Sequence, residues 1–304
     1  MATEHDDELA ELLREVRRIE VQSNRLVTDV MAGGYSSVFR GAGIEFDAVR
    51  EYVPGDDPRA VDWNVTARVG RPFVKKYAEE RELTVLFLLD LSASMSGGFG
   101  VLSARQMAAR VCACLALSAV KAGDKVGLIA FRDAVDAYVP AKKGLGHVLR
   151  IVRDCLVLPS GGTRSDLGPA LHFAASVVRR RAVIFLVSDF LVPSCGDGLA
   201  QCARRHDLIA VRLLTPELAP PAAGLMRVRD PETGTETLVD WSSARVRAAY
   251  AARVARWRAR HAGELRRANV DLMDVPVPRV SDKDAVARPI LGFFKMREAR
   301  GAKR

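Results

Sequence analysis

The sequence predicts an α/β protein built on a doubly wound, mostly parallel β-sheet. Between Leu83 and Leu214, short apolar runs alternate with segments of helical length. Runs that are apolar on both faces are typical of central parallel strands, and strand–helix alternation is typical of an open sheet covered on both sides. The chain has 304 residues, 49% of them hydrophobic and 27% charged, which suits a globular protein with a sizeable core.

An amphipathic helix is expected within residues 1–34. Apolar residues recur every three or four positions from Leu9 to Val30, and Gly33-Gly34 would end the helix. The simpler interpretation is a helix that packs on the core, and the alternative is a coiled coil with a partner. Residues 35–82 follow as a small β-containing segment, because short strand-like pieces flank the turn sequence VPGDDPR.

Residues 83–214 are expected to form the main domain. Its strands are predicted over 83–90, 125–131, 182–189 and 207–214, with a short edge strand over 135–140, and its helices over 103–122, 146–156, 166–180 and 199–206.

Residues 215–304 are expected to form a C-terminal extension, with a hairpin that turns near Glu232 and a long helix over 242–268. That helix carries an apolar stripe containing His261, interpreted as a core histidine. Residues 241–269 hold eight arginines against one glutamate, whereas residues 4–20 hold seven acids against three arginines. Because the two ends carry opposite charge, the N-terminal helix is expected to pack near this C-terminal helix.

Several classes of protein are disfavoured. No apolar run approaches the roughly 20 residues needed to cross a bilayer, and the acidic N-terminus does not resemble a signal peptide, so the protein is expected in the cytoplasm. Association with a membrane-bound partner is left as an alternative.

The five cysteines form no CxxC pair and are expected to be buried free thiols.

Oxygen-bearing side chains are expected to meet at the carboxyl ends of the parallel strands, where such sheets bind ligands. Asp90 ends one apolar run, Ser92 and Ser94 follow it, Asp189 ends another run, and Thr163 lies in the loop SGGTRSD, beside Ser165 and Asp166. An all-oxygen set suits Mg²⁺, with Mn²⁺ or Ca²⁺ as substitutes. In the alternative interpretation the two serines only cap the following helix, which explains neither acid.

This pattern resembles the metal-ion-dependent adhesion site of von Willebrand factor A domains. That motif reads Asp-x-Ser-x-Ser followed by a distant Thr and a distant Asp, which would be Asp90, Ser92, Ser94, Thr163 and Asp189. The resemblance implies a bound Mg²⁺ and a partner whose acidic side chain completes the metal's coordination.

Residues 35–214 also resemble a bacterial family, domain-of-unknown-function family 58. The matching residues are Gly43, Glu45, Phe46, Arg50, Tyr52, Gly55, Asp56, Arg59, Asp62, Trp63, Arg68 and Glu80. The resemblance implies a MoxR-type AAA+ ATPase as partner, in the assembly or activation of client proteins. Many members carry N-terminal membrane spans, in place of which this chain has its acidic helix. The charged residues at 45, 50, 59, 62 and 68 are expected to form a buried ion network, or else a partner surface.

The expected function is therefore a non-enzymatic, Mg²⁺-dependent protein-interaction module. A metal-dependent phosphohydrolase is one alternative, but the acid needed two residues after the nucleophile is replaced by Ser92. The second alternative is nucleic-acid binding through the arginine-rich C-terminal helix.

Overall fold

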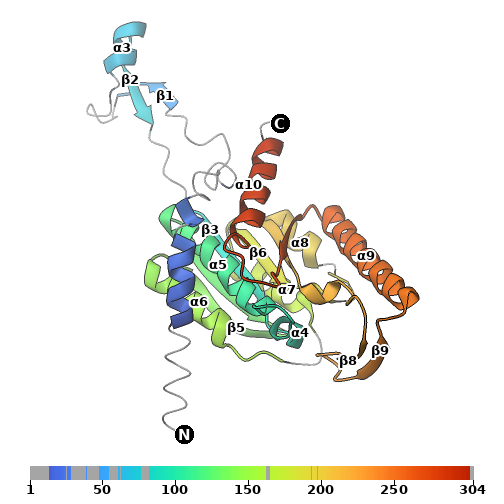
Figure 1. Ribbon diagram of the computed structural model, residues 1–304. Helices are drawn as coiled ribbons and strands as arrows, with labels where there is room; N and C mark the ends of the chain where they lie inside the picture. Colours follow the sequence, from blue (N-terminus) through green and yellow to red (C-terminus); the bar gives the residue numbers. More distant parts are fainter. Residues whose placement is uncertain are drawn as a thin grey trace.

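The fold is a six-stranded, mostly parallel sheet with helices on both faces, as predicted (Figure 1). The computed structural model describes residues 14–24, 26–28, 39, 48–54, 61, 63–76, 82–161, 165–192, 194–196 and 198–301. The strand order is β10-β7-β6-β3-β4-β5, and β5 alone runs antiparallel to its neighbour. The strands are β3 (Thr84–Asp90), β4 (Lys125–Phe131), β5 (Val135–Lys142), β6 (Val183–Ser188), β7 (Asp207–Leu214) and β10 (Asp271–Pro276).

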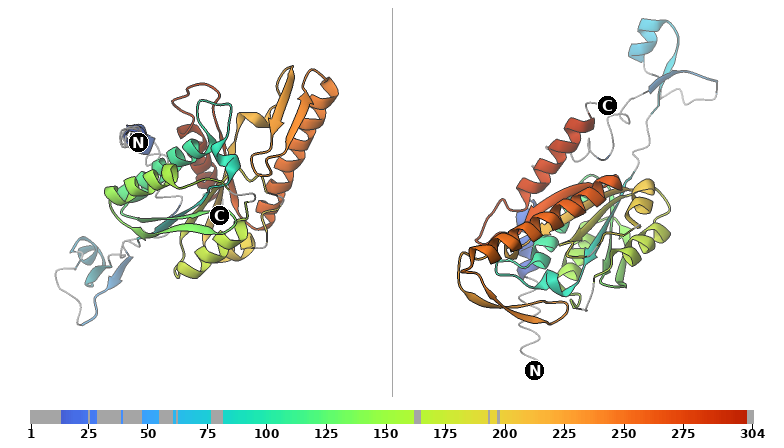
Figure 2. Two further views of the ribbon diagram at one scale, coloured as in Figure 1. Left: turned by 90° about the horizontal axis from the view of Figure 1, so that it is seen from below. Right: turned by 90° about the vertical axis from the view of Figure 1, so that its right-hand side faces the viewer.

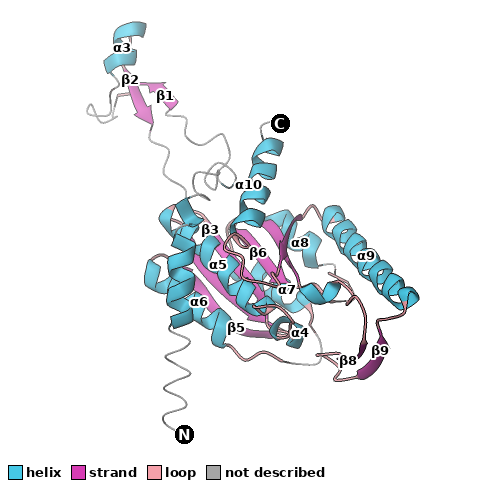
Figure 3. Ribbon diagram, in the orientation of Figure 1, coloured by secondary structure: helices cyan, strands magenta, loops and turns pink. Residues whose placement is uncertain are grey.

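Alternation along the strands divides the apolar residues between two cores. On β3, Val85, Phe87 and Leu89 enter one core, whereas Leu86 and Leu88 enter the other. The first core contains α5 (Ala104–Lys121), α6 (Leu145–Val157) and α10 (Ala287–Gly301), and the second contains α7 (Leu167–Val177), α8 (Gly198–Arg205) and α9 (Ala244–Arg267). Figure 3 shows the strands enclosed between these helices. The predicted helices and strands of residues 83–214 are confirmed.

The N-terminal helix packs on α5, so its expected place near the arginine-rich helix is wrong. The chain is helical over residues 14–24 and 26–28, and Val16, Ile19 and Val27 join the core that contains α5. The Arg110 guanidinium on α5 lies 2.5 Å from the Glu15 carboxylate. In Figures 1 and 2 this helix and α9 lie at opposite sides of the molecule. Apolar contact with α5 fixes the helix, and Arg110 meets its acidic face.

A small antiparallel pair precedes the main sheet. β1 (Ala48–Glu51) pairs with β2 (Phe73–Lys76), and α3 (Trp63–Val69) lies between them in the chain. Of the residues expected in a buried ion network, Arg68 is exposed, which contradicts that prediction at this position. Glu45, Arg59 and Asp62 lie outside the described residues, as does the Arg50 side chain.

The C-terminal part supplies the predicted hairpin and helix, and one strand that was not predicted. The hairpin consists of β8 (Leu225–Arg229) and β9 (Glu236–Asp240), and Ser243 caps α9. β10 pairs in parallel with β7, so the main sheet draws its last strand from beyond Leu214. His261 on α9 is fully buried, as expected. All five cysteines are buried and free. None of the described helices has both the length and the apolar character needed to cross a membrane.

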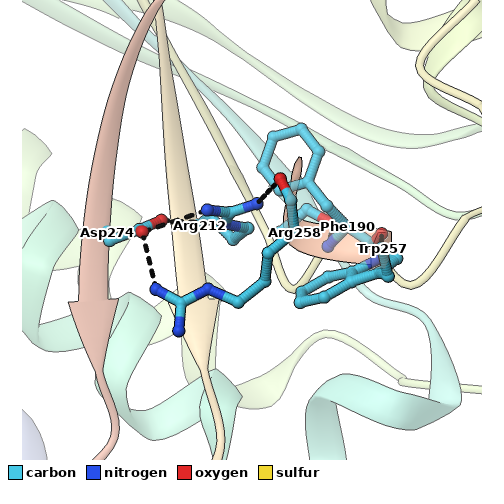
Figure 4. A network of polar contacts seen from close by, with 6 residues as sticks. Phe190, Arg212, Trp257, Arg258 and Asp274 are labelled. Carbon is cyan, nitrogen blue, oxygen red and sulfur yellow. Dashed lines mark hydrogen bonds and ion pairs between the residues drawn. The ribbon is translucent and has the colours of Figure 1, made fainter. Parts of the chain in front are cut away.

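A buried ion pair joins β7, β10 and α9 (Figure 4). The Arg212 side chain is 2% exposed, and its Nε and a terminal nitrogen lie 2.8 and 3.0 Å from the two Asp274 oxygens. Arg258 on α9 approaches the same carboxylate at 3.3 Å, and Arg212 stacks on the Trp257 ring. Trp257 in turn donates from Nε1 to the Phe190 carbonyl at 2.9 Å. The network therefore fixes α9 against the loop that follows β6.

Asp274→Ala should lower the free energy of unfolding by about 3 kcal/mol, because it leaves the buried Arg212 without its carboxylate. Chemical denaturation measures the change. The control is Arg227→Ala, which removes one partner of the exposed Arg227–Glu236 pair on the hairpin and should change stability by less than about 0.5 kcal/mol. Equal effects of the two substitutions would contradict a structural role for the buried pair.

Candidate metal centre

The candidate site lies where the winding of the sheet reverses. β3 and β6 are adjacent parallel strands, and the chain continues from them toward opposite edges of the sheet. Their carboxyl ends carry Asp90 and Ser188-Asp189. A crevice outside the strand ends forms at such a switch point, because the two connections leave in opposite directions. The topology thus places the two predicted acids together.

Asp90 is fully buried and accepts hydrogen bonds from three segments of the chain. Its Oδ1 accepts from the Ser92 N–H at 2.8 Å. Its Oδ2 accepts from the Ser165 hydroxyl at 3.0 Å and from the Ser188 hydroxyl at 2.6 Å. Burial raises the pKa of Asp90, and these hydrogen bonds act in the opposite direction. Asp90 thereby ties together β3, β6 and the loop before α7.

The two serines of the motif face each other rather than the helix that follows them. Ser92 precedes the short helix α4 (Ala93–Ser96), but its side chain makes no capping hydrogen bond. Instead, the Ser92 and Ser94 hydroxyl oxygens lie 3.1 Å apart. The interpretation in which these serines only cap a helix is therefore not supported, and their hydroxyl groups remain beside the two acids.

Asp189 carries the clearest sign of a missing positive charge. Its Oδ1 accepts from the Leu191 N–H at 2.9 Å, whereas its buried Oδ2 has no hydrogen-bond partner among the described residues. Burial, followed by the negative charge of Asp90, raises the pKa of Asp189 to about 7. Two carboxylates held this close in a buried place repel each other unless a proton or a cation lies between them.

The residue after Asp189 has an unusual backbone conformation. Phe190 has a φ of 56°, in the left-handed region that bulky residues avoid. It is held there from both sides, because its N–H donates to the Ser188 hydroxyl at 2.9 Å and its carbonyl accepts from Trp257. Such strain is maintained only where the surroundings impose it. Here it turns the chain sharply behind Asp189.

One acid outside the predicted set, Glu232 of the hairpin, is influenced by the charge of the site. The turn between β8 and β9 carries Glu232, on which the charge of Asp90 acts. Glu232 Oε1 is buried and makes no hydrogen bond within the described part of the chain. Burial first, and then the charges of Asp90 and Asp230, raise the pKa of Glu232.

Four of the five predicted residues are brought together, and the fifth, Thr163, lies outside the described residues. Ser165, which was noted only as a neighbour of Thr163, contacts Asp90 directly. Asp166 instead caps α7, by accepting from the Gly168 N–H at 2.9 Å. Ser188 was read only as a strand residue, although its position directly before Asp189 at a strand end was an available signal.

The donor set fits a hard divalent cation. The described groups are carboxylates and hydroxyls, and the buried Oδ2 of Asp189 has no hydrogen-bond partner among the described residues. Oxygen donors of this kind suit Mg²⁺, Mn²⁺ or Ca²⁺. A cation would also offset the repulsion between Asp90 and Asp189.

Comparison with known proteins identifies the family. Residues 48–260 match the family described as "Protein of unknown function DUF58". The chain belongs to this family. An uncharacterised protein of Mycobacterium tuberculosis is 31% identical over 223 residues, which cover 72% of this chain and 70% of that protein. One of Mycobacterium avium is 31% identical over 170 residues, which cover 54% of this chain and 95% of that protein.

Two solved structures show a similar course of the chain. The conserved hypothetical protein BatB from Bacteroides thetaiotaomicron is 17% identical with a TM-score of 0.42, and the match covers 73% of this chain and all of the solved chain. The von Willebrand factor A domain of SpRpn10 is 11% identical with a TM-score of 0.35, covering 69% of this chain and 94% of that domain. These likenesses concern the fold alone.

The metal-free DUF58 protein should lose stability as the pH rises from 5 to 8. The Asp189 carboxyl gives up its proton near pH 3.8 when unfolded and near pH 7 when folded. The folded state therefore binds the extra proton between these values. Stability should fall with rising pH, by on the order of 1.4 kcal/mol per unit.

Denaturation of wild type and Asp189→Asn in EDTA at both pH values measures this effect. The variant lacks the titrating group, so its stability should fall less between pH 5 and pH 8. Added Mg²⁺ should restore wild-type stability at pH 8. Identical pH profiles for the two proteins would contradict the crowding of acids at the site.

Proposed function

We propose that this DUF58 protein is a non-enzymatic, Mg²⁺-dependent protein-interaction module that acts with a MoxR-type AAA+ ATPase. The observation that carries the proposal is the convergence of buried acids and hydroxyls, with an unpartnered oxygen on Asp189, at the switch point of the sheet. The resemblance to the adhesion-site motif supports the metal and the mode of binding. The family resemblance supports the ATPase as partner in the assembly or activation of clients.

In this proposal Asp90, Ser92, Ser94, Thr163 and Asp189 hold the ion. When bound, Mg²⁺ supplies a positive centre that can accept a carboxylate oxygen from another protein. Asp90 organises the site, because its three hydrogen bonds orient the segments that carry the other groups. Neutral hydroxyls among the ligands leave the ion with enough positive charge to attract an acidic side chain.

The surface beside the site suits an acidic partner. Leu191, two residues after Asp189, is 45% exposed and lines a groove of about 720 Å³ between its loop and α9. Tyr250, Val254 and Trp257 line the groove with largely apolar side chains, and three arginines also line it, at 253, 256 and 260. A partner segment with acidic and apolar side chains would complement both features.

The surroundings of Asp90 favour binding over phosphoryl transfer. Its Oδ2 accepts two hydrogen bonds and its Oδ1 accepts one, so of the roughly four acceptor positions of a carboxylate one remains, on Oδ1, which is enough to bind an ion. The residue two positions later is Ser92, whose hydroxyl contacts Ser94, and a serine in place of a carboxylic acid is a poor general acid. These contacts support a role for Asp90 in holding the site together.

Asp90→Asn should abolish both Mg²⁺ binding and Mg²⁺-dependent binding to a MoxR-type ATPase of the same organism. Asparagine keeps the shape but removes a charge, so the fold should persist. Calorimetry measures the metal, and biolayer interferometry with Mg²⁺ or EDTA measures the partner.

The matched control is Glu82→Ala, at the opposite end of β3, where Glu82 pairs with Lys125 and Lys143. This variant should bind metal and partner as the wild type does. Partner binding that is indifferent to EDTA, while Mg²⁺ binds the site, would place recognition on another surface.

A further inference from the structure

We propose that Cys195, His261 and Glu264 form a zinc site that joins α9 to the loop after β6. This site is separate from that of Asp90 and Asp189, so the inference goes beyond the proposed function and does not rest on it. The role of the metal is structural, because it would attach a C-terminal helix to the loop that follows a candidate ligand of the other site.

The three side chains come together from two elements. His261 and Glu264 stand three positions apart on α9, so they lie on one face of the helix. Cys195 lies in the loop after β6, and its N–H donates to the Glu264 Oε2 at 3.0 Å. One potential ligand atom from each of the three side chains lies within 4.8 Å of the other two. Zinc holds sulfur, nitrogen and oxygen ligands at about 2.0–2.3 Å, so atoms at this spacing can share one ion after small side-chain movements.

His261 is the member of this cluster whose polar atoms are left unsatisfied. Its ring is fully buried, and neither ring nitrogen has a hydrogen-bond partner among the described residues. The Trp257 ring packs edge-on against it, with 5.6 Å between the ring centroids. Burial lowers the pKa of His261, which favours the neutral imidazole that binds metals. A buried nitrogen without a partner is costly, and a bond to a metal would satisfy it.

The chemistry of the donors selects zinc. A thiol, an imidazole and a carboxylate supply sulfur, nitrogen and oxygen, the set that Zn²⁺ prefers, whereas Mg²⁺ prefers oxygen alone. Burial, followed by the charge of Glu264, raises the pKa of Cys195 to about 12. Zinc would bind the thiolate, and the thiol proton would leave to the solvent. One thiolate and one carboxylate then balance the charge of the ion. Since Cys195 is only 1% exposed, its sulfur is poorly placed to attack a substrate, which favours a structural role.

A metal here would add a second attachment between α9 and the loop after β6. The first is the hydrogen bond from Trp257 to the Phe190 carbonyl (Figure 4). His261 follows Trp257 by about one helical turn. Leu191 of the loop and Arg260 of α9 both line the groove described above. The zinc would therefore hold the two sides of that groove at a fixed separation.

The test measures the zinc carried by protein produced in zinc-supplemented medium. Elemental analysis should find one zinc per chain in the wild type and none in Cys195→Ser or His261→Asn. The matched controls are Cys202→Ser and His206→Asn, which should keep the zinc. Cys202 and His206 are also buried, and the His206 ring nitrogens also lack hydrogen-bond partners within the described part of the chain.

A third variant guards against loss of folding. Glu264→Gln keeps an oxygen that can accept from the Cys195 N–H, so its fold should persist. Competition with a chromophoric chelator should show its affinity for Zn²⁺ to be at least about tenfold weaker than that of the wild type, since even groups behind the ligands commonly contribute that much.

Cobalt separates this site from that of Asp90. Co²⁺ bound to a thiolate gives a sulfur-to-metal charge-transfer absorption, which a site made of oxygen ligands does not give. The wild type, Cys202→Ser and Asp90→Asn should show this absorption, and Cys195→Ser should not.

The outcomes keep this inference distinct from the proposed function. A wild type that carries no zinc and shows no thiolate absorption with Co²⁺ overturns the inference, whatever Mg²⁺ does at Asp90. Equal zinc in the wild type and Cys195→Ser also overturns it, because the metal then lies elsewhere. Zinc that is lost with Cys195 or His261 and kept in both controls supports it, even if Mg²⁺ does not bind at Asp90.

Discussion

The structure depends on the burial of one carboxylate at the junction of two strands. Asp90 has no contact with solvent, and it binds the backbone after β3, the end of β6 and the loop before α7 at once. A buried charge is tolerated when it receives several hydrogen bonds. In satisfying Asp90, the fold brings hydroxyls and a second acid to the same point. The same hydrogen bonds thus satisfy the buried Asp90 carboxylate and bring the residues of the candidate site together.

The position of Asp189 is fixed by contacts of the residue that follows it. Asp189 sits on a turn whose next residue, Phe190, is kept in a left-handed conformation by bonds to Ser188 and Trp257. Trp257 belongs to α9, which the Arg212–Asp274 pair joins to the outer strands of the sheet. The position of a candidate ligand is therefore tied, through packed and hydrogen-bonded groups, to the part of the sheet completed last along the chain.

Most of the main domain could be predicted because its signals are local. Apolar runs mark β3, β4, β6 and β7, and a serine cap marks α9. β10 escaped prediction because its sequence, DLMDVP, contains two acids and a proline. Those acids are explained only by distant partners: Asp274 by Arg212, and Asp271 by Arg297 and Arg300. A strand whose charges are neutralised by tertiary contacts shows no apolar pattern.

The residues of the candidate site also fall into two groups, those that local sequence signals predict and those that such signals do not predict. Asp90, Ser92, Ser94 and Asp189 follow strands, so a rule about strand ends was enough to find them. Glu232 lies in a turn of a separate hairpin, and nothing near it in the sequence indicates that the charge of Asp90 acts on it. The N-terminal helix shows the opposite error: charge alone suggested a partner, whereas apolar contact with α5 decided its place.

The self-contained pairing of the hairpin has a consequence for how the family can diversify. Because β8 and β9 form no ladder with the main sheet, residues can be inserted, deleted or exchanged there without breaking a hydrogen bond of the central scaffold. The acids of the site stand on the scaffold, whereas the element above them is free to vary in length and chemistry. Selection can therefore change the surface around these acids while the strands that carry them are inherited unchanged.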